Sequence, residues 1–220
     1  MSSIFKIEEN HIVQLDSRQL HQILRRLLYL EAKQLGLVNK SIEVSLSIYI
    51  PDGGTDGKIE WQLGPQRGEF IPNTLSYFQC KSIKKNWTSA NFVNELKTKS
   101  RSQVTLKKKI EKIFDEKGSY IYFIAQPMVD EQKQNAISEI RLFLKSIGRK
   151  DFSKIDIHIY DAGKIAEWVN NFLVAQFEIL NYCGQQTVAG AIPYQVWQQL
   201  GKMRIPANYV VDAKRKEVIE

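Results

Sequence analysis

Four residues have the types and order that metal-assisted phosphodiester chemistry uses: Glu31, Asp56, Gln79 and Lys81. Asp56 lies in a Gly-Gly-Thr-Asp-Gly turn that leads into an alternating segment, and Gln79 and Lys81 lie in a Phe-Gln-Cys-Lys segment. Side chains two residues apart in a strand point to the same face, so Gln79 and Lys81 are expected to lie together. If the two segments are adjacent strands, all three side chains meet at one end of a sheet.

Glu31 interrupts the apolar stripe of an expected helix over residues 16–35, four residues after Leu27 and four before Leu35. An unpaired carboxylate in that position costs several kcal/mol to bury, so it should meet a cation, a donor or a metal ion. Pairing with Arg25 or Lys33 at the edge of the helix is the structural alternative.

Two carboxylates and a carbonyl oxygen form the oxygen-rich set that Mg²⁺ prefers. A lysine two residues along the strand can orient a water or offset charge that develops on phosphorus. The spacing therefore predicts phosphodiester hydrolysis.

These segments resemble the PD-(D/E)xK nuclease superfamily, and most of all its Mrr-like branch, in which Gln replaces the last acidic residue. The resemblance covers residues 16–126. It implies a restriction-endonuclease-like fold in which Glu31 and Asp56 bind metal, the Cys80 carbonyl is a further ligand, Gln79 is a ligand or positioning group, and Lys81 is the catalytic lysine. It also implies Mg²⁺ as cofactor, with Mn²⁺ as an alternative, and cleavage of double-stranded DNA. The sequence shows no specific base-reading motif, so little sequence preference is expected.

A later segment, residues 157–168, looks like part of the nuclease effector modules of bacterial anti-phage defence proteins, which are often fused to a nucleotide-binding or sensor domain. Cutting both strands needs two sites, so a homo-oligomer is expected.

The Gln79 amide departs from the superfamily pattern because it carries no negative charge. Glu60 or Glu43 could compensate, and Asp52 is a second choice for Asp56. Two other functions therefore stay open: a nucleic-acid-binding module of the same fold with weak or no activity, and an RNA nuclease. A protein-docking domain is a more remote alternative.

Positive charge is concentrated in residues 81–117, where eleven Lys and Arg accompany four acids, an excess equal to the whole chain's net charge of +7. Such a segment indicates an anionic partner, although a solvated lysine-rich helix face has the same composition. The expected DNA-contacting residues are Lys84, Lys85, Trp87, Lys107, Lys108 and Lys109. Trp87 could instead anchor the fold.

Hydrophobic periodicity predicts an α/β fold with a mixed sheet, an αβββαβ core and an extra α-β-α unit, with helices on both faces. The expected helices are 16–35, 103–117, 131–147 and 161–180, and the expected strands are 42–50, 58–63, 75–82, 120–125 and 154–160. Residues 1–180 are expected to form the nuclease-like domain. Residues 181–220, with a short helix at 194–202, are expected to be an appendage or a link to a further domain.

The remaining composition is that of an ordinary globular chain: 220 residues, 43% hydrophobic and 25% charged. No segment has the apolar length of a membrane span or the order of a secretory signal, so a cytoplasmic location is expected. His11, His21 and His158 lack metal-ligand spacing. The Cys80 side chain is expected to face away from the site, into the core, and Cys183 has no nucleophile context.

Overall fold

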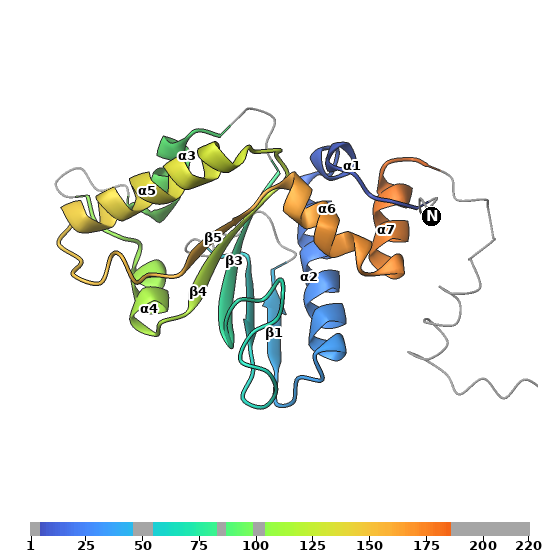
Figure 1. The fold of residues 1–220 in the computed structure, drawn as a ribbon, viewed down its shortest axis with the longest axis horizontal. Coiled ribbons are helices and arrows are strands. Elements are labelled where there is room, and N and C mark those ends of the chain that lie inside the picture. Colours follow the sequence, from blue (N-terminus) through green and yellow to red (C-terminus); the bar gives the residue numbers. More distant parts are fainter. Residues whose placement is uncertain (1–4, 46–54, 83–86, 99–103, 186–220) are drawn as a thin grey trace, which may run out of the picture. The chain divides into compact units, whose positions relative to one another are not determined.

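A computed structural model describes residues 5–45, 55–82, 87–98 and 104–185 and shows a five-stranded sheet with helices on both faces (Figure 1). The strands are β1 (Ser41–Val44), β2 (Gly57–Glu60), β3 (Leu75–Lys81), β4 (Ser119–Ile124) and β5 (Ile157–Tyr160). The helices are α1 (Glu9–Val13), α2 (Ser17–Gln34), α3 (Ser89–Leu96), α4 (Lys108–Asp115), α5 (Asp130–Ser146), α6 (Ala162–Asn170) and α7 (Leu173–Tyr182).

The strands lie in the order β1-β2-β3-β4-β5. β2 is antiparallel to both of its neighbours, whereas β3, β4 and β5 are parallel to one another. Gly57 lies opposite Phe78, and Gln79 lies opposite Tyr122. The expectation of a mixed sheet in an α/β fold is thus confirmed.

Strand β4, between β3 and β5, is buried along its whole length because a helical layer covers each face of the sheet. Ile121 and Phe123 point into the core shared with α1, α2, α6 and α7. Tyr120, Tyr122 and Ile124 point into the core shared with α3, α4 and α5. Figure 1 shows these two groups of helices on opposite sides of the sheet.

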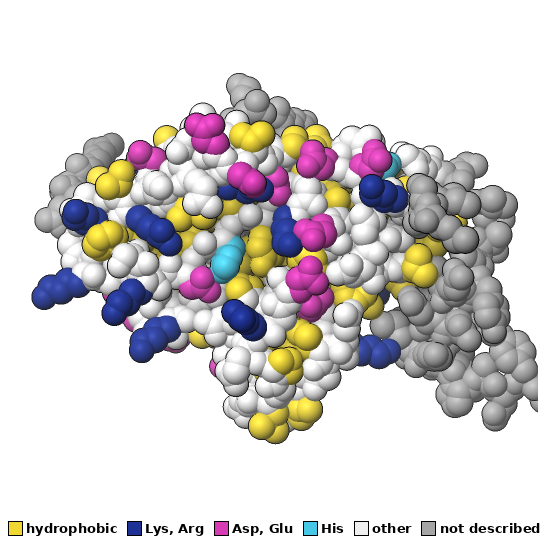
Figure 2. All heavy atoms as spheres, viewed as in Figure 1, with side chains coloured by type: hydrophobic (Ala, Val, Ile, Leu, Met, Phe, Trp, Pro, Cys, Tyr) yellow, Lys and Arg dark blue, Asp and Glu magenta, His cyan; other side chains and the backbone are white. Residues whose placement is uncertain are grey.

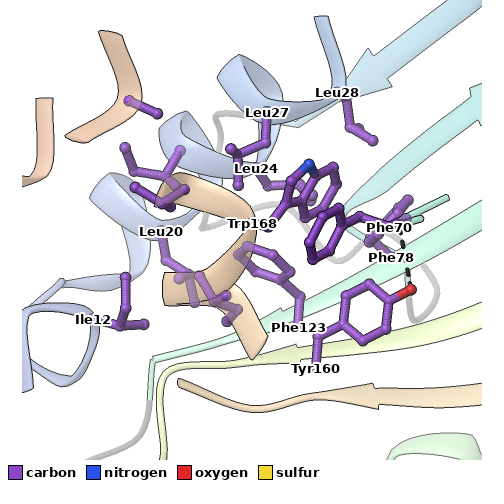
Figure 3. Packing of buried hydrophobic residues seen from close by; sticks show 14 of the residues in the cluster. Ile12, Leu20, Leu24, Leu27, Leu28, Phe70, Phe78, Phe123, Tyr160 and Trp168 are labelled. Carbon is purple, nitrogen blue, oxygen red and sulfur yellow. Dashed lines mark hydrogen bonds between the residues drawn. The ribbon is translucent and has the colours of Figure 1, made fainter. Parts of the chain in front are cut away.

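Trp168 on α6 lies at the centre of the first core, among Phe78, Phe123 and Tyr160 (Figure 3). Its ring stacks on Phe70, with centroids 5.3 Å apart and planes 3° from parallel. The Tyr160 hydroxyl donates to the Phe70 carbonyl at 3.2 Å. These two interactions of Phe70 hold the loop between β2 and β3 against α6 and β5.

The expected helix over residues 161–180 is two helices, because the chain breaks between α6 and α7. Phe172 adopts an extended conformation, with φ −133° and ψ 103°. The side chain of Asn170 exchanges two 2.8 Å hydrogen bonds with the backbone of Ile7, and these bonds fix the end of α6 against the start of the chain. A contact between residues so far apart in sequence leaves no local signal.

The other expected elements are present with shifted ends, except that the helix predicted over 103–117 begins only at Lys108, and α1 and α3 were not anticipated. Strand β1 is described up to Val44, and residues 46–50 of the predicted strand lie outside the described residues. The described part forms one unit that ends at Gln185, so most of the predicted appendage, including the helix at 194–202, lies outside it too. Across the described ranges, no helix is both long and apolar enough to cross a membrane.

Candidate functional site

Polar side chains meet at the edge of the sheet where the parallel strands end. Lys81 ends β3, Gln126 follows β4 and Asp161 follows β5, whereas Asp56 precedes the antiparallel β2 and so reaches the same edge. In open α/β sheets, ligands bind outside the carboxyl ends of the strands. The Gln126 side chain accepts a hydrogen bond from the Trp87 N–H. The Asp161 carboxylate accepts from the N–H groups of Met128 and Lys164, so both side chains hold the loops at this edge in place.

Asp56 is fixed by both its backbone and its side chain. Its N–H donates to the Phe78 carbonyl at 2.8 Å, and its carbonyl accepts from the Ser45 N–H at 2.9 Å. Its carboxylate Oδ2 accepts two hydrogen bonds of 2.6 Å, one from Gln79 Nε2 and one from the Cys80 N–H. The structure therefore brings Asp56 and Gln79 together, as the sequence predicted.

His21 reaches the other carboxylate oxygen of Asp56 from α2, with 3.3 Å between Nε2 and Oδ1. The close approach of α2 depends on Gly57, where an added Cβ would lie 3.0 Å from Leu24 Cδ2. Sequence reasoning missed His21, which is 4% exposed. The sequence could have indicated its burial, because His21 lies three residues before Leu24 and therefore next to the apolar stripe of the helix.

The Cys80 side chain packs into the core, on the face of β3 opposite Gln79 and Lys81, as expected, but its nearness to Asp56 was not anticipated. Its thiol is buried, and Sγ, His21 Nε2 and a carboxylate oxygen of Asp56 lie within 4.8 Å of one another. Asp56 lies at the end of the sheet and so reaches the face of β3 that packs against α2 as well as the face that carries Gln79. Because the N–H and C=O of a strand residue point to the same side, the Cys80 carbonyl also lies on the Asp56 side of β3.

Lys81 is held by Glu95 of α3, with 3.1 Å between Nζ and Oε2. Lys107 Nζ lies 3.8 Å from the same oxygen. The Lys81 ammonium lies 5.8 Å from the centroid of the Trp87 ring, which packs edge-on against Phe92. Trp87 thus anchors the fold as well as bordering Lys81, and Glu95 is a site residue that the sequence analysis did not single out.

The amide oxygen of Gln79 is buried and has no hydrogen-bond partner among the residues that the structure describes. Its orientation is set by the other end of the amide, since only Nε2 can donate to the ionised Asp56 carboxylate. A buried carbonyl oxygen without a partner is rare and costs about 1–3 kcal/mol. Oε1 is therefore a candidate ligand atom.

Glu31 does not join this site. It lies ten residues after His21 on the same helix, a rise of about 15 Å. Its carboxylate is buried and accepts a 3.0 Å hydrogen bond from Trp168 Nε1. Burial raises the pKa of Glu31; the Trp168 bond lowers it and the charge of Glu69 raises it further. The partner of this carboxylate is thus the Trp168 indole N–H, and not Arg25 or Lys33.

The remaining predicted residues are spread over the surface or lie outside the described residues. Lys108 and Lys109 are exposed at the start of α4. Lys84, Lys85 and Asp52 lie outside the described residues. Glu60 pairs with Lys58 at 2.7 Å at the far end of β2, and Glu43 accepts from the Ser41 hydroxyl, so neither is seen to compensate for Gln79.

Comparison with known proteins adds no relative: no family model, no curated protein and no solved structure matches this chain. The geometry of the site therefore carries the functional argument alone.

We expect Glu31→Gln to stabilise the protein more at about pH 8 than at about pH 4, because the glutamine removes a buried charge and can still accept from Trp168. A group whose pKa is raised by folding contributes stability at low pH that is lost as the pH rises through the folded-state pKa. Thermal unfolding of both proteins at the two pH values measures the difference.

Glu139→Gln is the control, because Glu139 is exposed in the middle of α5. A stability difference for Glu31→Gln that is as flat with pH as the control's would contradict the assignment of a costly buried charge.

Proposed function

We propose that this chain is a metal-dependent endonuclease that hydrolyses phosphodiester bonds of double-stranded DNA. The observation that carries the proposal is the meeting of Asp56 and Gln79 beside Lys81 at the carboxyl edge of the sheet, with the Gln79 oxygen buried and unpartnered. Perturbed or unsatisfied polar groups at such an edge are typical of active sites.

The donor set fits an oxygen-preferring divalent ion. Asp56 supplies a carboxylate, Gln79 a buried amide oxygen, and Cys80 a backbone carbonyl on the same side of β3. These groups would hold Mg²⁺, or Mn²⁺ in its place, and the chemistry that such an ion supplies is polarisation of the phosphate and the attacking water. Glu31, which the sequence assigned as a second ligand, has no part in this set.

The protein's own side chains have separate tasks in the proposed reaction. The Lys81 ammonium, held in place by Glu95, offsets the charge that develops on the phosphoryl oxygens. Gln79 fixes the Asp56 carboxylate through the Nε2–Oδ2 bond, so this group need not reorganise during the reaction. The Trp87 ring borders the lysine, with 5.8 Å between Nζ and the ring centroid.

The order of elements supports the restriction-endonuclease-like assignment. Helix α2, the antiparallel β1-β2-β3 and the parallel β4 follow one another as the αβββαβ core requires, with α3 and α4 before β4. Two further proposals come from the sequence and the reaction: a cytoplasmic location, and a homo-oligomer, because cutting both strands needs two sites. An effector role in anti-phage defence, beside a nucleotide-binding or sensor domain, is proposed from the resemblance.

A basic surface supports an anionic partner. Lys and Arg side chains gather at the end of the molecule formed by α4 and the end of α5 (Figure 2). Lys108 and Lys109 are exposed there, and Lys107 leads from this surface to Glu95 and Lys81. Phosphate contacts of this kind give affinity without sequence readout.

The second candidate is a nucleic-acid-binding module without hydrolysis. Its support is the low negative charge of the site. Among the described residues, the cluster of possible metal ligands around Asp56 contains His21 and Cys80 but no second carboxylate. An RNA nuclease using the same residues is the third candidate.

We expect the protein to cut supercoiled plasmid in Mg²⁺ or Mn²⁺, and Lys81→Ala to lower the rate about 100-fold or more, because one preorganised charge at a reacting phosphate contributes that much. Asp56→Asn should have an effect at least as large. Agarose-gel rates measure both, and circular dichroism verifies that the variants fold.

Lys154→Ala is the matched control, since Lys154 is exposed at the opposite end of the sheet, before β5. Wild-type rates in Lys81→Ala and Asp56→Asn would refute the assignment. Duplex binding without cleavage in any divalent ion would favour the binding module, and cleavage of tRNA or single-stranded RNA in preference to duplex DNA would favour the RNA nuclease.

The double variant Lys108→Ala/Lys109→Ala should weaken duplex binding and reduce the slope of log K against log salt by about 2, because two phosphate contacts are lost. Fluorescence anisotropy with a labelled duplex, over a series of salt concentrations, gives the slope. Arg25→Ala/Lys33→Ala is the control, because it removes the same charge from exposed positions of α2, on the opposite face of the sheet from α4. An equal change in both double variants would mean that only net charge matters.

A further inference from the structure

We propose that His21 Nε2, Asp56 Oδ1 and Cys80 Sγ together bind one borderline transition-metal ion of the Zn²⁺ class. These residues come from α2, from the position before β2 and from β3, and one ligand atom of each lies within 4.8 Å of those of the other two. The inference rests on the proposed function in taking Asp56 as a metal-binding residue, but it assigns a nitrogen and sulfur site for which Mg²⁺ is the wrong ion.

The tautomer of His21 prepares Nε2 for a cation. Nδ1 lies 2.5 Å from the carbonyl oxygen of Ser17. A carbonyl oxygen can only accept, so Nδ1 carries a proton, and in the neutral imidazole the Nε2 lone pair points toward Asp56 Oδ1, 3.3 Å away. Two lone pairs repel at that separation unless a proton or a metal ion lies between them.

The spacing of the two atoms fits a metal ion. Nitrogen and oxygen ligands, each about 2.0–2.1 Å from a tetrahedral Zn²⁺, lie ~3.3 Å apart, which equals the observed separation. Sulfur binds at about 2.3 Å, so a tetrahedral site needs Sγ ~3.5 Å from the other two ligand atoms. The Cys80 side chain therefore has to move inward by about 1.3 Å at most.

The outer shell of such a site is already in place. The Ser17 carbonyl orients His21, while Gln79 Nε2 and the Cys80 N–H hold Asp56 Oδ2 and so direct Oδ1 toward His21. Metal-binding histidines and carboxylates depend on partners of this kind for orientation and basicity.

The Cys80 thiol decides which ion fits. Thiolate and imidazole ligands favour Zn²⁺ and similar ions, whereas Mg²⁺ takes oxygen. The thiolate and the Asp56 carboxylate would together balance the charge of a divalent ion at this buried position. Three protein ligands leave a fourth coordination position that a water molecule would take.

Titration of the chelator-treated full chain with Co²⁺, in the absence of nucleic acid, tests the site. We expect one Co²⁺ per chain, the intense visible bands of tetrahedral cobalt and a near-ultraviolet thiolate-to-cobalt charge-transfer band, all abolished when Zn²⁺ displaces Co²⁺. Cys80→Ser should lose the charge-transfer band, and Cys183→Ser, which changes the other cysteine, should keep it.

His21→Ala is the second variant, in case Cys80→Ser fails to fold, and should weaken Co²⁺ binding by about 100-fold or more, because it removes one of three ligands. Absence of stoichiometric Co²⁺ binding, or a spectrum that neither variant changes, would overturn the site and leave a protonated His21 paired with Asp56. Because no nucleic acid is present, this result is independent of the cleavage assay. A Co²⁺ site without nuclease activity would contradict only the proposed function.

Discussion

The hydrogen bonds of the Asp56 carboxylate are the constraint on which the site depends. Oδ2 accepts from Gln79 Nε2 and the Cys80 N–H, and Oδ1 faces His21 Nε2. One side chain therefore joins α2 to the ends of two strands. Each charge-assisted bond contributes about 1.5–3 kcal/mol, so loss of Asp56 would affect the fold as well as the chemistry.

Asp56 also separates two chemically different environments. On the α3 face of the sheet lie Gln79 and the Lys81–Glu95 pair, which suit phosphate and an oxygen-preferring ion. On the α2 face lie His21 and Cys80, which suit a softer ion. We therefore assign substrate charge to the α3 face and a transition metal to the α2 face, with Asp56 shared between them.

Local pattern in the sequence was sufficient for most of the fold and for part of the site. Period-two alternation predicted β2 and β3, and with them the contact of Asp56 with Gln79. The apolar stripe predicted α2 but not which end of it faces Asp56. Which end faces Asp56 depends on how α2 packs against β2 at Gly57. This packing places His21, and not Glu31, beside Asp56. The break between α6 and α7 depends on Asn170 reaching Ile7, a contact that no local window contains.

Crystals grown with Zn²⁺ and measured at the zinc absorption edge would test the central claim most directly. The account predicts one anomalous peak, about 2.0–2.3 Å from His21 Nε2, Asp56 Oδ1 and Cys80 Sγ. A peak elsewhere on the chain, or a structure in which His21 and Asp56 are not neighbours, would contradict it.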